Sequence, residues 1–290
     1  MKKFRQVLAD INELIVFKHS VFALPFIFIA MITASKLQNN TMWFGWRLLI
    51  LGILCAVSAR SFAMAFNRYM DKDIDEPNPR CANRPSVDGR IGKTNLLIFI
   101  GVNALIFIVV AYFINSLAFY LSFPILIFLG GYSIFKRFSQ TAHIMLGFCL
   151  GLAPIAGSVA ILGAIPLWAI LLCFGVAFWV AGFDILYSLQ DMEYDKKAGL
   201  YSIPACYGSK AAMFISSVFH AITILFWLLF CMASNLGFFA YLGVIISAII
   251  LYKEHEIVNK DFTKIDKAFF TLNGYLGIMF FCFIFLDLKI

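Results

Sequence analysis

Residues 95–114 read NLLIFIGVNALIFIVVAYFI, a stretch without a single charged side chain. A helix needs about 20 mainly apolar residues to cross the hydrocarbon core of a membrane, so this stretch predicts a transmembrane helix. Similar apolar runs lie at 14–35, 46–69, 117–135, 141–163, 166–190, 211–233, 237–252 and 268–287. The sequence therefore predicts an all-α, integral membrane bundle of about nine transmembrane helices, with residues 1–290 forming a single domain.

The overall composition supports the same class of protein. Apolar residues make up 62% of the chain and charged residues 13%, whereas a soluble domain has roughly 45–50% and about 25%. The net charge of +7 could indicate a nucleic-acid partner. However, the basic residues fall in short loops between the apolar runs, where they orient a membrane protein. We therefore expect membrane lipid around the chain and no nucleic-acid partner.

The distribution of Lys and Arg predicts the side of the membrane on which each loop lies. Eighteen of them are found at the N-terminus and in the even-numbered loops, against three in the opposite loops and the C-terminal tail. Cytoplasmic loops carry an excess of basic residues. We therefore expect a multi-pass protein of the cytoplasmic membrane with its N-terminus in the cytoplasm and its C-terminus outside.

The loop after the second apolar run is unusually acidic. Residues 67–85 read NRYMDKDIDEPNPRCANRP. Basic residues are enough to orient a membrane protein, so the carboxylates in this loop need a separate explanation. Asn67, Asp71 and Asp75 follow one another at intervals of four, so they lie within an arc of about 80° if the helix continues past the membrane surface. Asp73 points roughly the opposite way. The spacing predicts one polar face that emerges from the membrane.

A second acidic segment follows the sixth apolar run. Residues 184–195 read DILYSLQDMEYD, and Asp184, Tyr187, Asp191 and Asp195 also fall within about 80° of helical arc, whereas Glu193 faces away. Asn67, Asp71 and Asp75 of the first face have counterparts 120 positions later in Tyr187, Asp191 and Asp195. A parallel internal repeat would produce this register. Both segments are expected on the cytoplasmic side, where they can share one cavity.

Carboxylates gathered in one cavity need a cation, because otherwise they repel one another and resist ionisation. A site of oxygen ligands without His or Cys favours a hard cation such as Mg²⁺, which commonly joins carboxylates to the phosphates of a substrate. Basic residues near the two segments could bind the remaining phosphate oxygens: Arg80, Arg84, Lys136, Arg137, Lys196 and Lys197. A metal-bound diphosphate at a membrane surface, with its apolar tail in the bundle, is an isoprenoid diphosphate.

Three further residues are candidates for lining the site. Arg60 and Asp184 lie inside apolar runs, where an ionised side chain costs at least about 2.5–3.5 kcal/mol near the membrane centre. Lys18 stands at the start of the first run. Other polar residues have simpler interpretations. Asp73, Glu76, Glu193 and the charged run 253–267 are interpreted as solvated surface, and His143 and His220 as hydrogen-bonded helix histidines. Gly147 and Gly151 are interpreted as positions of close helix packing.

These residues resemble the UbiA family of intramembrane aromatic prenyltransferases, over nearly the whole chain. NRYMDKDID keeps Asn67, Asp71 and Asp75 of the first family signature, and DILYSLQDMEYD matches the second signature, DxxYxxxDxxxD, in full. RCANRP at 80–85, the arginine at position 60 and FKRFS at 135–139 are also similar to family features. Arg68 departs from the family, because many members carry Asp there. FALPF (22–26) and GLYSIP (199–204) resemble in particular the bacterial 4-hydroxybenzoate polyprenyltransferases.

The resemblance implies a Mg²⁺-dependent enzyme that transfers a polyprenyl group from polyprenyl diphosphate to a small aromatic acceptor, such as 4-hydroxybenzoate, in ubiquinone or menaquinone biosynthesis. By analogy, the metal ligands are Asn67, Asp71, Asp75, Asp191 and Asp195. The catalytic residues are Asp71, Asp184, Tyr187 and Asp191, and the substrate-binding residues are Lys18, Arg60, Arg80, Arg84, Lys136 and Arg137. The reaction would be an electrophilic aromatic substitution at a cytoplasm-facing active site. The alternatives are a cation-coupled transporter, a phospholipid-head-group transferase, or a UbiA-like enzyme with a different acceptor.

Overall fold

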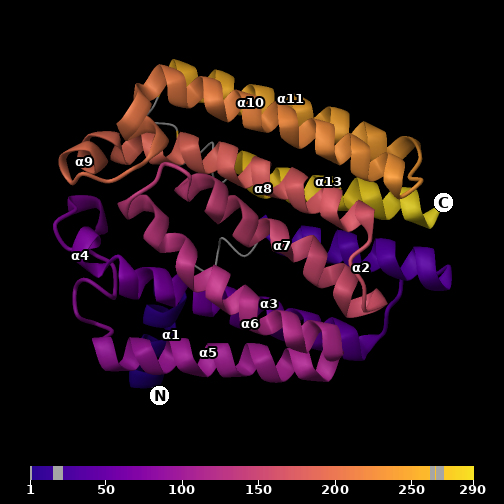
Figure 1. Ribbon diagram of the computed structural model, residues 1–290, viewed down its shortest axis with the longest axis horizontal. Helices are drawn as coiled ribbons and strands as arrows, with labels where there is room; N and C mark the ends of the chain where they lie inside the picture. Colours follow the sequence, from indigo (N-terminus) through magenta and orange to yellow (C-terminus); the bar gives the residue numbers. More distant parts are fainter. Residues whose placement is uncertain (1, 16–21, 262–264, 266–270) are drawn as a thin grey trace. The chain divides into compact units, whose positions relative to one another are not determined.

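The computed structural model describes residues 2–15, 22–261, 265 and 271–290. Helices and turns account for these residues, without a strand, so the all-α prediction is confirmed for the described chain (Figure 1). The longer helices are α1 (Lys2–Leu14), α2 (Leu24–Asn39), α3 (Trp46–Met70), α5 (Lys93–Ile114), α6 (Ser116–Gly131), α7 (Ala142–Leu162), α8 (Leu167–Ser188), α10 (Ile203–Ala233), α11 (Phe238–Lys260) and α13 (Asn273–Lys289). The short ones are α4 (Lys72–Asp75), α9 (Met192–Lys197), η2 (Pro79–Cys81), η3 (Tyr132–Arg137) and η4 (Leu189–Asp191).

Seven described helices are long and apolar enough to cross a membrane. They correspond to α3, α5, α6 with η3, α7, α8 with η4 and α9, α10, and α11. The other two predicted spans match α2 and α13, which have 16 and 17 residues. At 1.5 Å per residue, 16 residues reach about 24 Å. The chain is therefore a multi-span membrane protein, and the count of nine spans stays a prediction.

Several predicted boundaries differ from the structure, each for a local reason. The first span was expected from residue 14, but α1 ends at Leu14 and α2 begins at Leu24, with Pro25 in its first turn, where proline is tolerated. Helix α10 begins eight residues before the predicted 211, because Ser202 caps its N-terminus by accepting a hydrogen bond from the backbone of Ala205. Gly208, with φ of 80°, then kinks α10 before the apolar run that begins at residue 211.

The chain divides into two compact units, which are described separately. The larger unit comprises Val21–Leu49 and Phe135–Ile290. Its core is aromatic: Phe26, Trp179, Trp227 and Phe280 are all fully buried, and the Trp227 and Phe280 rings stack with their centroids 4.4 Å apart. These side chains come from α2, α8, α10 and α13, so the packing of large rings joins four helices.

Close packing of α7 on α8 depends on small residues, as the sequence predicted. A Cβ atom at Gly147 would collide with the carbonyl oxygen of Ala177, and one at Gly151 would lie 2.7 Å from the carbonyl oxygen of Cys173. Both contacts are with backbone, which cannot move aside cheaply. The prediction of close helix packing at these two glycines is therefore confirmed.

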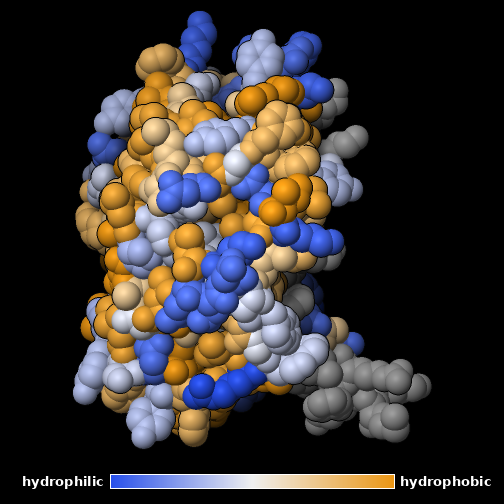
Figure 2. All heavy atoms as spheres, turned by 90° about the vertical axis from the view of Figure 1, so that its right-hand side faces the viewer, coloured by the Kyte–Doolittle hydropathy of each residue, from blue (hydrophilic) through white to orange (hydrophobic). Residues whose placement is uncertain are grey.

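The smaller unit comprises Met1–Ser20 and Ile50–Ile134. Helices α5 and α6 form a tight hairpin at Asn115, whose side chain accepts a hydrogen bond from the backbone of Ala118 at 2.8 Å. Large apolar side chains on α5 remain exposed, among them Ile98, Leu105 and Tyr112. Exposed apolar side chains on a helix suit contact with lipid. On the face drawn in Figure 2, apolar side chains (orange) are mixed with hydrophilic ones (blue).

Candidate active site

The first acidic segment spans the junction between α3 and α4. Asp71 separates the two helices, but the helical hydrogen bonds continue from the Asp71 nitrogen to the Asn67 oxygen (2.9 Å) and from the Asp75 nitrogen to the Asp71 oxygen (2.8 Å). Asp71 and Asp75 are therefore on the buried side, with 2% and 4% of their surface exposed, whereas Asp73 is exposed. This burial pattern agrees with the predicted helical face.

Polar contacts join the residues of this face in two groups. The side-chain nitrogen of Asn67 donates a hydrogen bond to Oδ2 of Asp71 at 2.6 Å. Arg84 Nη1 donates to Oδ2 of Asp75 at 2.5 Å, and Arg68 Nη1 lies 3.8 Å from the same oxygen. The segment thus combines an Asn–Asp pair with a carboxylate that contacts two arginines.

The remaining basic candidates of this unit have different surroundings. Arg60, within α3, donates from Nη2 to the backbone oxygen of Ile15 at 3.5 Å. Arg80 is exposed and belongs to η2, where its backbone nitrogen donates to the side chain of Asn78. Lys18 lies outside the described residues, so its assignment stays a prediction.

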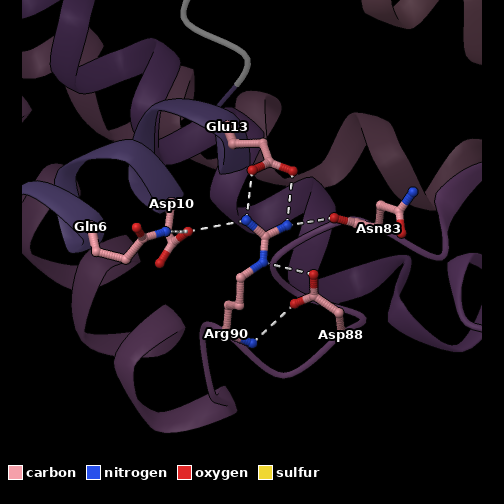
Figure 3. Close-up of polar contacts among 6 residues, drawn as sticks. All are labelled: Gln6, Asp10, Glu13, Asn83, Asp88 and Arg90. Carbon is pink, nitrogen blue, oxygen red and sulfur yellow. Dashed lines mark hydrogen bonds and ion pairs between the residues drawn. The ribbon is translucent and has the colours of Figure 1, made fainter.

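Arg90 ties the N-terminal helix to the loop that carries Arg80 and Arg84 (Figure 3). Its guanidinium donates to Glu13 at 2.7 and 2.9 Å, to Asp10 at 3.0 Å and to Asp88 at 2.7 Å. These hydrogen bonds, that to Glu13 first, raise the pKa of Arg90. Desolvation would raise the pKa of Asp88, but the backbone and side-chain hydrogen bonds from Arg90 outweigh it, and that pKa lies below its usual value.

Arg90→Ala should loosen this connection. We expect faster amide hydrogen exchange in α1 and in residues 83–92, because three carboxylates lose a shared donor. The exchange rate of the α7–α8 helices, in the other unit, should stay the same. Lys93→Ala, three residues along the chain, serves as the matched loss of one positive charge. Equal exchange in α1 for Arg90→Ala and Lys93→Ala would contradict the role given to Arg90.

The second acidic segment is less regular than a single helix. Helix α8 ends at Ser188, and residues Leu189–Asp191 form the 3₁₀ turn η4 before α9 begins. A 3₁₀ turn has three residues per turn, so the assumption of a uniform 100° per residue is wrong beyond Ser188. Even so, Glu193 is exposed, as predicted, whereas Asp184 and Asp191 are half-buried.

His143 of α7 holds Asp184 in place. His143 Nδ1 lies 2.7 Å from Oδ2 of Asp184, and the backbone nitrogen of Ile203 donates to Nε2 at 3.2 Å. Because Nε2 accepts a hydrogen bond, Nδ1 carries the proton and donates it toward the carboxylate. The sequence predicted a hydrogen-bonded histidine here, but it did not identify Asp184, 41 positions away, as the partner.

Other predicted residues gather around Asp195. Its carboxylate is hydrogen-bonded by the side chain of Ser202 and lies within electrostatic range of Asp191, Lys136 and His143. The backbone oxygen of Lys136 accepts a hydrogen bond from the backbone of Tyr201 at 2.8 Å, which fixes η3 beside the segment after α9. The structure therefore brings two of the predicted second-segment residues, Asp191 and Asp195, together with one predicted basic residue, and adds Ser202.

The last two candidates lie at the edge of this group. Tyr187 is half-buried and packs against the apolar core of α8 and α10. Arg137 ends η3 and is half-buried.

Glu254 corrects one sequence interpretation. The charged run 253–267 was expected to be solvated, but Glu254 is 1% exposed. Its Oε1 accepts a hydrogen bond from Asn273 at 2.6 Å, and Asn273 accepts one from Trp179 Nε1 at 2.8 Å. Helix α11 extends beyond the apolar run, so its polar end still has one face inside the bundle. The sequence did contain one sign of this burial: Glu254 lies four residues before the apolar Val258, so the two share a helical face, and Val258 is also buried.

The donor chemistry of the two acidic segments suits a hard cation. Each offers carboxylate or amide oxygens, which Mg²⁺ prefers, and the first one holds Asn67 against Asp71. In the part of the chain that the structure describes, no three His, Cys, Asp or Glu side chains already form a metal-binding group. The residues present fit Mg²⁺ by ligand type.

Comparison with known proteins gives one consistent result. A sequence model of the UbiA prenyltransferase family matches residues 23–284, a range that includes both acidic segments. The chain is 27% identical over 221 residues to the 4-hydroxybenzoate octaprenyltransferase of Paraburkholderia phytofirmans, covering 73% of this chain and 72% of that protein.

Two solved structures share the arrangement of helices. The apo structure of a UbiA homolog from Aeropyrum pernix K1 superposes with a TM-score of 0.82 at 29% identity, over 93% of this chain and 98% of that one. A UbiA homolog from Archaeoglobus fulgidus, bound to GPP and Mg²⁺, superposes with a TM-score of 0.71 at 19% identity. The latter covers 97% of this chain and 100% of that one.

Proposed function

Because the chain belongs to the UbiA prenyltransferase family, we propose that it transfers a polyprenyl group from polyprenyl diphosphate to an aromatic acceptor, 4-hydroxybenzoate or a related ring, in respiratory quinone biosynthesis. The observation that carries the proposal is the presence of two acidic segments within the matched residues 23–284. The likeness to an octaprenyltransferase that acts, by its name, on 4-hydroxybenzoate supports the choice of donor and acceptor. Residues 1–290 would act as one transferase domain.

The proposed cofactor is Mg²⁺, for which each acidic segment offers oxygen ligands. The ligands would be Asn67, Asp71 and Asp75 from the first segment and Asp191 and Asp195 from the second. Support comes from the ligand types and from the homolog of the same fold that binds GPP and Mg²⁺. When bound, the metal would draw negative charge onto the departing diphosphate.

The chain's own residues would supply the rest of the mechanism. Arg60, Arg80, Arg84, Lys136, Arg137 and Lys18 are proposed to bind phosphate oxygens. The allylic C–O bond breaks, and its electron pair leaves with the diphosphate. An aromatic carbon of the acceptor then forms the new C–C bond, and the ring loses its proton to a base, for which Asp191 is the proposed candidate.

Three structural features prepare the chain for this reaction. Asp184 is oriented by His143, which lies within electrostatic range of Asp195, and its carboxylate would stabilise positive charge on the prenyl group. The ring of Tyr187 would add a cation–π contact. Large apolar side chains fill the bundle and keep water from a carbocation.

The experiment that tests this function uses purified protein in lipid nanodiscs. It is incubated with Mg²⁺, prenyl diphosphates of several lengths and a panel of aromatic compounds that includes 4-hydroxybenzoate. We expect mass spectrometry to find a ring carrying one prenyl group with at least one donor–acceptor pair. Prenylation of another ring only would revise the acceptor. Failure with every pair, by protein that remains folded, would contradict the proposed function.

We also propose that the chain has nine spans and that both acidic segments lie on the cytoplasmic side of the cytoplasmic membrane. The excess of Lys and Arg in the corresponding loops supports this orientation. In a cysteine-less background, single cysteines in 76–90 and 196–208 should react with an impermeant reagent only from the cytoplasm, and a cysteine at the C-terminus only from outside. Labelling of the two loops from opposite sides would mean that the segments cannot share one substrate.

A further inference from the structure

Arg68 is buried at the end of α3 with few partners. Its side chain is 11% exposed, and its one contact with a carboxylate is the 3.8 Å approach to Oδ2 of Asp75. That distance is beyond hydrogen-bonding range. Among the residues that the structure describes, none accepts a hydrogen bond from this guanidinium, which carries five N–H donors. These donors, beside a single carboxylate, remain available to an anionic ligand that reaches them.

Asp75 does not neutralise the positive charge around it. Its Oδ2 already accepts a hydrogen bond from Arg84 at 2.5 Å. Two guanidiniums therefore share one carboxylate oxygen, so the group of Arg68, Asp75 and Arg84 has a net charge of +1. Arg84 is 27% exposed, which leaves it within reach of a ligand from outside. Asp71, on the same helical face, is instead engaged by Asn67.

A diphosphate is the anion that fits these donors. The planar fork of arginine donates two parallel hydrogen bonds to phosphate oxygens, and a diphosphate offers several oxygens at the spacing of neighbouring guanidiniums. Resting on the proposed function, we infer that Arg68, together with Arg84, binds the diphosphate of the prenyl donor directly. The chain then has affinity for a diphosphate even without a divalent metal. Arg68 stands at a position of the first signature where many family members carry Asp, which could not make this contact.

Asp75 has a second role in this arrangement. Without ligand its Oδ2 holds the Arg84 guanidinium and lies 3.8 Å from that of Arg68, so a diphosphate must compete with Asp75 for the donors of Arg84. Removing the carboxylate charge should therefore strengthen metal-free binding, although Asp75 is also a proposed metal ligand. Asp75→Asn should therefore strengthen diphosphate binding without metal and weaken binding that depends on metal, and these opposite changes make it an informative variant.

The test measures binding of inorganic pyrophosphate by calorimetry in EDTA. The protein is held in phosphatidylcholine nanodiscs, so that no anionic headgroup competes. We expect Arg68→Gln to bind about ten- to a hundredfold more weakly than wild type, as the loss of a hydrogen bond to a charged group predicts. Asp75→Asn should bind more tightly than wild type. Lys72→Gln, which removes an exposed positive charge four residues away, should stay within about twofold. If Arg68→Gln does not fold, Arg68→Lys should bind more weakly than wild type, because the fork is lost and the charge is kept.

Two results would overturn the inference. One is wild-type protein that binds no pyrophosphate in EDTA, and the other is equal affinity in wild type, Arg68→Gln and Arg68→Lys. A parallel measurement with Mg²⁺ and a non-hydrolysable prenyl thiolodiphosphate separates this inference from the proposed function. Wild-type protein that binds the prenyl donor in Mg²⁺, with no loss in the Arg68 variants, would refute the Arg68 contact alone. Protein that ignores the prenyl donor but binds pyrophosphate through Arg68 would refute the proposed donor and keep the anion site.

Discussion

Asp71→Ala and Asp191→Ala are each expected to lower the rate of prenyl transfer by about 10²–10³-fold. Each change removes a proposed metal ligand, and one contact that stabilises charge in the transition state is typically worth that factor. Asp71 is 2% exposed and pairs with Asn67, whereas Asp191 is half-buried near Asp195. The measurement is product formed per folded protein at saturating Mg²⁺.

Asp73→Ala and Glu193→Ala are the matched controls. Each lies two residues from its partner, removes the same charge and is exposed. Because exposed substitutions are usually within about ±0.5 kcal/mol of neutral, these variants should keep activity within about twofold. Equal losses at all four positions would show that the buried faces are not the catalytic ones. Melting temperatures and size-exclusion profiles verify that the alanine variants at Asp71 and Asp191 remain folded.

Removal of divalent metal should abolish transfer. Carboxylates that face a diphosphate need a hard cation between them, so excess EDTA should reduce turnover to background and added Mg²⁺ or Mn²⁺ should restore it. EDTA that is saturated with Mg²⁺ beforehand is the control for effects of the chelator itself. Full turnover in excess chelator would contradict the proposed mechanism. Pyrophosphate binding through Arg68 would persist in the same EDTA buffer, so binding and turnover should separate.

The helices were predictable because their signal is local. Seven apolar runs reappear as spanning helices, and the bounds of α7 differ from prediction by one residue at each end. The start of α10 was missed because it depends on a serine cap and a glycine kink, not on apolarity. The extension of α11 to Lys260 was missed because only one face of its polar end is buried.

The acidic segments were predictable in composition but only partly in geometry. The spacing of Asn67, Asp71 and Asp75 predicted that they share one helical face, and helical hydrogen bonds do cross the junction at Asp71. The spacing did not predict the backbone geometry of Leu189–Asp191, because nothing in the sequence there distinguishes a 3₁₀ turn from a further α-helical turn. The contact of His143 with Asp184 and that of Arg84 with Asp75 join different elements. Such tertiary contacts leave no periodic pattern in the sequence.

Under the proposed function the protein transfers a prenyl group, rather than hydrolysing the donor or transporting a cation. The most direct test follows released diphosphate and prenylated ring in the same reaction, with wild-type protein, Mg²⁺ and the acceptor found in the panel. We predict that the two products appear one for one and that both depend on the acceptor. Diphosphate release without a prenylated ring, or an unchanged donor in the presence of folded protein and every acceptor, would contradict the assignment.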